Sequence, residues 1–206
     1  MMRFLFKDGK FVMSVNNTYK PKENEVVILG SKYDYEKMKF SHIDDNGNIV
    51  FDEEAYHQDK KMQLLSTLSK RYNRVVSAIP RLIDPDIFQG LEEVYKTKYE
   101  AALEAKKSNN YSFFADEAKI FGVTAQDIAN KVIQIGTLYK KAYNAKVLEI
   151  DAARVYIKKL IEYKCYEEAL KGLRYFKNIT PQSSFDKLMS ICTGGLSVLE
   201  YCKNKL

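Results

Sequence analysis

The hydrophobic pattern of this chain changes near residue 52 and keeps its new period to the C-terminus. Before that point, short apolar runs alternate with turn residues, which is typical of β-strands. From Glu53 onward, apolar residues recur every three or four positions, which indicates helices. We therefore expect an α+β fold, with a small N-terminal antiparallel β meander over residues 1–52 and an elongated all-α region over residues 53–206.

The first strands are predicted from a short turn motif. Asp8-Gly9 separates two β-prone runs, residues 3–6 and residues 11–15. Both positions of a two-residue hairpin turn need positive φ, and Asp-Gly is one of the pairs that such turns favour. A third short strand is expected over residues 25–29, ended by Gly30. These segments predict a hairpin followed by a further strand.

A second hairpin is expected around Asp44-Asp45-Asn46-Gly47, between residues 38–43 and residues 48–51. The same acidic turn also places oxygen ligands at the first positions of a possible calcium loop. Position 12 of that loop is Ala55, which has no carboxylate for the metal. We therefore predict a turn and no metal site.

The helical region divides into three parts by its breaking residues. Short helices are expected over residues 53–122, a long helix over residues 123–178 and a C-terminal helix over residues 184–203, with Gly194-Gly195 as the weak point of the last.

Individual residues indicate where these helices begin and end. Pro80 is expected to end the first helix, and Asp84-Pro85-Asp86 to begin the next with an N-cap and a first-turn proline. Thr124 and Asp127 resemble a capping box at the start of the long helix.

An apolar stripe on the long helix is the candidate partner-binding surface. Its members recur at helical spacing and so share one face: Ile128, Val132, Ile135, Tyr139, Tyr143, Val147, Ile150 and Ile157. A helix of this length needs a neighbouring helix or another subunit to cover such a stripe. Tyrosine supplies contact area at low entropic cost, so we expect self-association or binding of another protein along this face.

The positive charge lies mainly in the C-terminal half. The formal net charge of the chain is +6, and residues 111–206 supply most of it, with 15 basic and 10 acidic side chains. Lys140-Lys141 and Lys158-Lys159 are five helical turns apart and share one side of the long helix. We interpret them as a solvated face and do not expect nucleic acid as a partner; a basic helical adaptor that binds nucleic acid is the alternative.

No motif in the chain predicts catalysis. Cys165, Cys192 and Cys202 have no metal-ligand spacing, and we expect them to be reduced and mostly buried. His42 and His57 have no flanking ligand pair, and there is no glycine-rich phosphate loop or nucleophile elbow. We predict a protein that is not an enzyme, with no catalytic residues, cofactor or metal; an enzyme that uses Cys192 or Cys202 is a weaker alternative.

The N-terminal apolar run is too short for a signal peptide, because charges follow at Lys7 and Asp8. No stretch approaches the length of apolar sequence that spans a bilayer. We expect a protein that is made in the cytoplasm and does not bind membranes.

The order of the segments carries a resemblance. A short β segment leads to the turn over residues 43–51 and then to a helix that begins among charged residues. Residues 114–118, 121–124 and 152–154 are further matching segments. Over residues 1–161 this layout resembles the tail-fibre assembly and tail-associated proteins of bacteriophages.

The resemblance implies a non-enzymatic protein whose partners are other tail or fibre proteins, or a second copy of itself. Its role would be that of a fibre-assembly chaperone or of a structural component of the tail or baseplate. Such a protein is cytoplasmic when made, and incorporation into a virion or a phage-tail-like particle is the expectation for a structural component. Residues 166–206 lie outside the resemblance.

Overall fold

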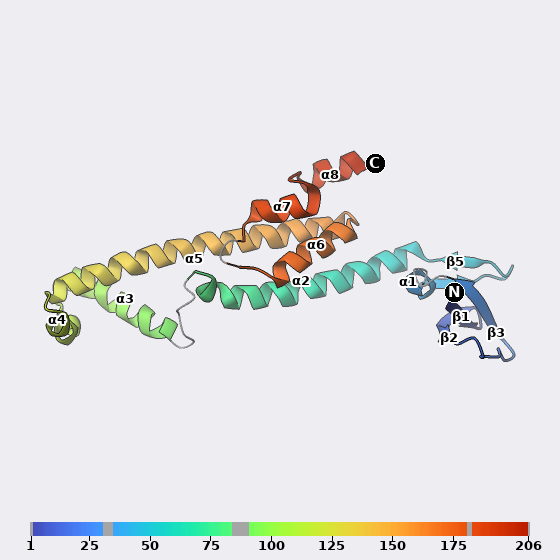
Figure 1. Ribbon diagram of the computed structural model, residues 1–206, viewed down its shortest axis with the longest axis horizontal. Helices are drawn as coiled ribbons and strands as arrows, with labels where there is room; N and C mark the ends of the chain where they lie inside the picture. Colours follow the sequence, from blue (N-terminus) through green and yellow to red (C-terminus); the bar gives the residue numbers. More distant parts are fainter. Residues whose placement is uncertain (1, 31–34, 84–90, 181–182, 206) are drawn as a thin grey trace. The chain divides into compact units, whose positions relative to one another are not determined.

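The computed structural model describes residues 2–30, 35–83, 91–180 and 183–205, and the chain divides into two compact units, Met1–Leu64 and Leu65–Leu206 (Figure 1). The predicted α+β class is confirmed. A five-stranded antiparallel sheet comes first, helices follow, and one of these helices is 38 residues long.

The first unit contains the sheet and a short helix. Its elements are β1 (Met2–Lys7), β2 (Lys10–Val15), β3 (Glu25–Gly30), α1 (Tyr35–Met38), β4 (Ser41–Ile43) and β5 (Ile49–Phe51). Both predicted hairpins form, as β1–β2 and as β4–β5. The second begins three residues later than expected, because Met38 ends α1.

The strand order is β3-β1-β2-β4-β5, whereas a simple meander keeps the strands in sequence order. The difference arises because β3 pairs with β1 on the edge opposite β2. Three consecutive residues of β1, Phe4, Leu5 and Phe6, are buried, so this strand is covered on both faces. A strand of that kind is best placed inside a sheet, with a neighbour on each side.

The two predicted hairpin turns have the expected geometry. Asp8 and Gly9 both have positive φ, of 50° and 72°. In the second turn, Asp44 Oδ1 accepts hydrogen bonds from the backbone N–H groups of Asn46 (3.0 Å) and Asn48 (2.7 Å). The bond from Asn48 is the main reason that the pKa of Asp44 is lowered. The carboxylate therefore closes the turn.

Helix α2 (Glu53–Ile83) begins where the hydrophobic period changes, and Asp52 caps it by accepting a hydrogen bond from the backbone N–H of Ala55 (2.9 Å). The boundary between the compact units lies later, at Leu64. Within the first unit, the Tyr56 ring packs on the rings of Phe40 and Phe51, with centroids 5.7 and 5.6 Å away. The first turns of α2 therefore belong to the same unit as the sheet.

Two predictions about α2 need correction. The helix is 31 residues long rather than short, and it continues past Pro80 to Ile83. Pro80 lacks the N–H of one helical hydrogen bond, and the fully buried Ile79 beside it anchors this last turn. The predicted helix start at Asp84-Pro85-Asp86 lies outside the described residues.

The helical unit continues with α3 (Leu91–Ser108), the 3-10 turn η2 (Ser112–Phe114), α4 (Ala115–Phe121), α5 (Ala125–Glu162), α6 (Tyr166–Lys177), α7 (Phe185–Thr193) and α8 (Val198–Lys205). The capping box predicted for α5 forms: Thr124 Oγ1 accepts from the backbone N–H of Asp127 (3.1 Å), and Asp127 Oδ2 accepts from the backbone N–H of Thr124 (3.2 Å).

The helix predicted over residues 123–178 is two helices. Helix α5 ends at Glu162, Lys164 adopts the left-handed conformation with φ of 58°, and α6 folds back against α5. A Cβ at Gly172 would lie 2.8 Å from Ile157 Cγ1, so glycine allows the two helices to approach closely. The C-terminal helix predicted over residues 184–203 also divides, into α7 and α8, at Gly194-Gly195, where both φ angles are positive.

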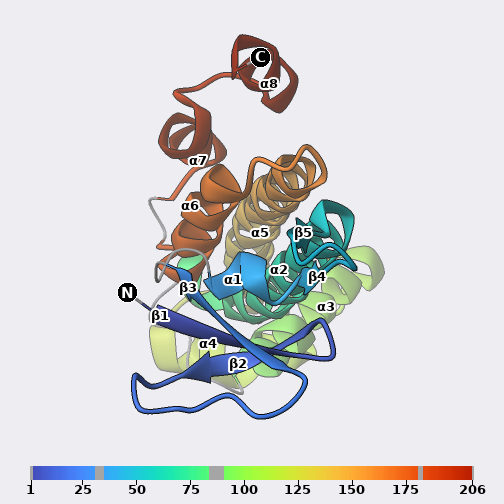
Figure 2. The ribbon, with the colours of Figure 1, turned by 90° about the vertical axis from the view of Figure 1, so that its right-hand side faces the viewer.

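Helix α5 takes part in two separate cores. At its N-terminal end it packs with α3, η2 and α4 around Ala102, Phe114 and Ala129. Figures 1 and 2 show α6 beside the C-terminal half of α5, with α7 next to it. The fully buried residues around that second half include Ile157, Leu160, Leu173, Phe176 and Leu188. Residues 130–149, between the two cores, contain no buried side chain.

Candidate interaction surface on helix α5

Three of the predicted partner-binding residues are buried in the cores of the helical unit. Ile128 belongs to the core formed with α3 and α4 and is 8% exposed. Ile150 and Ile157 are 2% and 0% exposed in the second core. These three side chains are covered by the chain's own helices, so they are not part of the candidate surface.

The other five predicted residues lie in or next to the stretch between the two cores. Ile135 is 57% exposed, whereas the remaining four are half-buried: Val132, Tyr139, Tyr143 and Val147. The rings of Tyr139 and Tyr143 are stacked, with centroids 6.4 Å apart. Of the predicted stripe, therefore, Ile135 is the member most available to another molecule.

A second set of apolar residues on this stretch is open to solvent. Leu138 is 62% exposed, and Ala142 and Ala145 are also exposed. With Ile135 they are spaced by three, four and three positions, so all four share one face of the helix. We refer to Ile135, Leu138, Ala142 and Ala145 as the α5 row.

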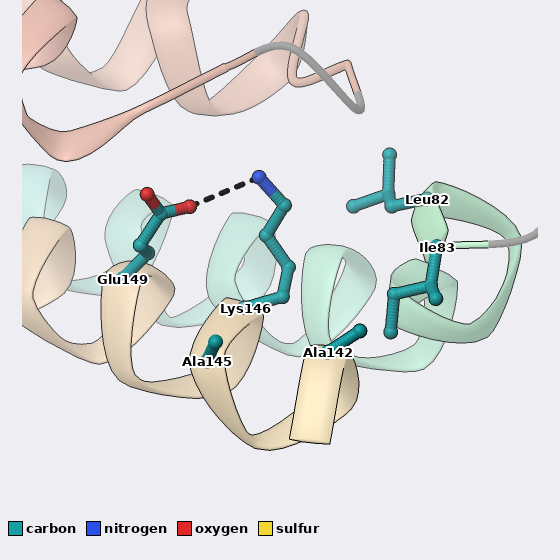
Figure 3. Close-up of a pocket in the computed structure, with 6 residues that line it drawn as sticks. All are labelled: Leu82, Ile83, Ala142, Ala145, Lys146 and Glu149. Atoms are coloured by element: carbon teal, nitrogen blue, oxygen red, sulfur yellow. Dashed lines mark hydrogen bonds and ion pairs between the residues drawn. The ribbon is translucent and has the colours of Figure 1, made fainter. Parts of the chain in front are cut away.

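The α5 row leads into a cleft of about 390 Å³ (Figure 3). The cleft is lined by Leu82 and Ile83 at the end of α2 and by four residues of α5: Ala142, Ala145, Lys146 and Glu149. Its walls are mainly aliphatic. The cleft has room for a large apolar side chain.

The edge of the cleft is formed by an ion pair. Lys146 Nζ donates to Glu149 Oε2 (3.0 Å) and to the carbonyl oxygen of Ser183 (2.8 Å). The Lys146 side chain is only 12% exposed, so its aliphatic part helps to form the wall. This lysine is already engaged within the unit.

Other lysines near the α5 row have no acidic partner in the part of the chain that the structure describes. Lys131 lies four positions before Ile135 on the same face, and Lys141 lies at the flank of the row; both are exposed, and neither forms an ion pair with a described residue. The exposed apolar row is therefore bordered by uncompensated positive charge.

Leu138, Ala142 and Ala145 are not among the residues predicted from the sequence. They lie beside the predicted stripe, rotated by roughly 20–80° from Ile135 around the helix axis at about 100° per residue. The apolar face of a helix is wider than a single line of residues, and this width is the sequence signal that could have identified them. Small alanines add little to a hydrophobic pattern, so the row was not evident.

The histidines and the cysteines belong to different units of the chain. The two histidines lie in the first unit, where His57 Nε2 is 3.2 Å from Glu53 Oε1, and the three cysteines lie in the second. Burial raises the pKa of the Cys192 thiol to about 11, so this thiol is protonated at neutral pH. Among the described residues, no group of three or more potential ligands is placed to hold a metal ion.

Within the described parts of the chain, none of the helices combines the length and the apolar character required to cross a bilayer. No protein-family model, curated protein or solved structure matches the chain.

Proposed function

We propose that this chain is a non-enzymatic, tail-associated protein of a phage or prophage. It acts by protein–protein contacts, as an assembly chaperone for a tail fibre or as a structural component of the tail or baseplate. The resemblance of residues 1–161 to such proteins supports the biological setting. The observation that carries the mode of action is the α5 row, an exposed apolar face between two cores on one long helix.

The partner segment that fits this surface best is an acidic amphipathic helix of another protein. Apolar anchors at helical spacing are the usual basis of recognition between a helix and a groove. The two alanines of the α5 row allow a second helix to approach closely, and the adjoining cleft accommodates one of its larger side chains. Lys131 and Lys141 are placed to pair with carboxylates along its edge.

The free energy available from the row itself is limited. Fully burying one leucine or isoleucine side chain contributes about 1.5–3 kcal/mol, and both Ile135 and Leu138 are already partly covered. A micromolar complex needs about 8 kcal/mol. The α5 row is therefore the anchor of a larger interface, which includes the lysines and further contacts with the partner.

The test is complex formation with the products of the neighbouring genes, followed by size-exclusion chromatography with light scattering. We expect a complex, and we expect Ile135→Asp together with Leu138→Asp to weaken it at least about 100-fold, because two charges then enter the apolar contact. Val155→Asp is the control: Val155 is 46% exposed on the same helix and points about 160° away from Ile135 and about 100° away from Leu138.

Three results would overturn the proposal. A chain that remains a monomer beside all its neighbours has no such partner. An equal effect of Val155→Asp would show that the row is not the contact. A homodimer that the Ile135 and Leu138 changes dissociate would place a second copy on the row, in place of an acidic helix.

A basic helical adaptor that binds nucleic acid is the second candidate, and the uncompensated lysines beside the row favour it. If Lys131 and Lys141 each contact a phosphate, the affinity for duplex DNA falls with salt, with a log–log slope of about −2. Absence of binding to DNA and RNA at low salt would exclude this function.

A further inference from the structure

Two thiols from distant parts of the sequence lie in contact in the helical unit. The Sγ atoms of Cys165 and Cys202 are 3.2 Å apart. The first belongs to the turn between α5 and α6, and the second belongs to α8. A disulfide bond joins sulfur atoms at about 2.05 Å, so an approach of about 1 Å completes the bond.

The backbone around Cys165 is held firmly. Its N–H donates to the carbonyl oxygen of Leu160 (2.9 Å), and its own carbonyl oxygen accepts from the N–H of Ala169 (3.0 Å). The Cys165 side chain is 8% exposed. This thiol is therefore a fixed point on the corner where α5 meets α6.

Helix α8 positions the second thiol. The Tyr201 hydroxyl donates to Glu168 Oε1 (2.6 Å), which ties α8 to the first turn of α6, and Val198 is 4% exposed. Cys202 follows Tyr201 directly and is half-buried, so small solutes reach it more readily than they reach Cys165. The two helices thus present one accessible and one shielded thiol to each other.

We propose that Cys165 and Cys202 form a reversible disulfide that fastens α8 to the α5–α6 turn when the chain meets a small disulfide oxidant such as oxidised glutathione. In a reducing compartment both cysteines stay reduced, as expected from the sequence. The bond therefore forms when the surroundings of the protein become more oxidising. It converts α8 from a helix held by side-chain contacts into one held covalently.

The reaction is a pair of thiol–disulfide exchanges. The Cys202 thiolate attacks one sulfur of oxidised glutathione, the glutathione S–S bond breaks, and one glutathione thiolate leaves. The Cys165 thiolate then attacks the Cys202 sulfur of this mixed disulfide, and the second glutathione thiolate leaves. The two cysteine protons end on the two glutathione thiols, so two electrons pass from the protein to the oxidant.

Cys192 supplies an internal control. It is 3% exposed, and burial raises the pKa of its thiol to about 11, so it reacts slowly even though it lies in the same unit. Its sulfur packs near Gly172 of α6, 3.3 Å from the position that a Cβ would occupy there. We expect no disulfide at this position.

To test this, the full chain is equilibrated with graded ratios of reduced to oxidised glutathione. The samples are quenched with acid and denatured, and the remaining thiols are alkylated. The peptides are then mapped by mass spectrometry. We expect the chain to lose the mass of two hydrogens, with one linked peptide pair that contains Cys165 and Cys202. The midpoint of thermal unfolding should rise by about 5 °C or more and return on reduction, because the bond closes a loop of 37 residues.

Variants distinguish this pair from general thiol oxidation. Cys192→Ser should keep both the mass change and the thermal shift, whereas Cys202→Ala should lose both. The Cys202 site is half-exposed, so alanine there leaves the fold intact, and circular dichroism of the reduced protein checks this. The proposal is wrong if oxidation stops at a glutathione adduct on Cys202, links two chains, or includes Cys192.

Discussion

At the residue scale, the close packing of α3 on α5 depends on Gly136. A Cβ at this position would lie 2.2 Å from Cδ2 of the Tyr99 ring, well inside van der Waals contact. The Tyr99 hydroxyl in turn lies 3.4 Å from Thr137 Oγ1. Gly136 sits in the interior of a helix, where glycine is normally unfavourable, so its presence is explained by the aromatic ring that occupies the space of a side chain.

We predict that Gly136→Ala lowers the free energy of unfolding of the helical unit by about 1–3 kcal/mol. The added methyl group forces the Tyr99 ring out of its position, and this overpacking exceeds the gain of about 1 kcal/mol in helix propensity. Urea unfolding followed by circular dichroism measures the change.

The partner of this contact provides the control. In a Tyr99→Ala background the space is empty, so Gly136→Ala should stabilise the unit by up to about 1 kcal/mol through helix propensity alone. If the two substitutions have simply additive effects, the ring is not the reason for the glycine.

At the scale of single elements, the turn between α5 and α6 is the feature that the sequence pattern did not predict. Tyr163-Lys164-Cys165 contains neither glycine nor proline, and apolar residues at helical spacing continue on both sides. The turn forms because α6 buries Ala169, Leu173 and Phe176 only when it folds back. Lys164, with φ of 58°, carries the strain of that reversal.

We predict that Lys164→Gly raises the free energy of unfolding by up to about 1 kcal/mol. A residue with a Cβ costs about 1–2 kcal/mol in the left-handed conformation, and glycine avoids this cost while losing some of the gain to its more flexible unfolded state. Thermal or urea unfolding measures the difference.

Lys171→Gly is the matched control, because Lys171 is an exposed residue inside α6. The same exchange of lysine for glycine should there be destabilising by about 1 kcal/mol. Effects of the same sign at both positions would contradict the role assigned to the turn.

At the scale of the whole molecule, each of the two units has buried residues of its own. Phe6 is fully buried in the first unit, and Ile79 is fully buried in the second. Helix α2 supplies residues to both, since its first turns belong to the unit of the sheet and its later turns to the helical unit. The boundary lies inside a continuous helix, twelve residues after the change of hydrophobic period at residue 52.

We predict that truncations in the two cores act on separate parts of the chain. Phe6→Ala should lower the stability of the first unit by about 3–5 kcal/mol, and Ile79→Ala should lower that of the helical unit by about 2–5 kcal/mol. Hydrogen exchange with mass spectrometry should show faster exchange of the sheet in the first variant and of α5 to α7 in the second. Equal acceleration of both units in either variant would show that they unfold as one.

The features determined by the sequence alone are those whose hydrogen bonds lie within a few residues. Asp8-Gly9 and Asp44 specify the two hairpin turns, and Thr124 with Asp127 specifies the start of α5. In each case the donor and the acceptor, or the turn angles, belong to a single short segment. The α+β class is predictable for the same reason, because the hydrophobic period is also a local property.

The tertiary structure decided which surfaces are covered. A stripe of apolar residues on α5 predicts that something covers it, but the pattern does not distinguish the chain's own helices from another protein. Packing of α3, α4, α6 and α7 buries Ile128, Ile150 and Ile157 and leaves Ile135 exposed beside Leu138. The contact of Cys165 with Cys202 and the fit of Tyr99 over Gly136 arise in the same way, because they join residues 37 positions apart whose distance depends on how whole helices pack.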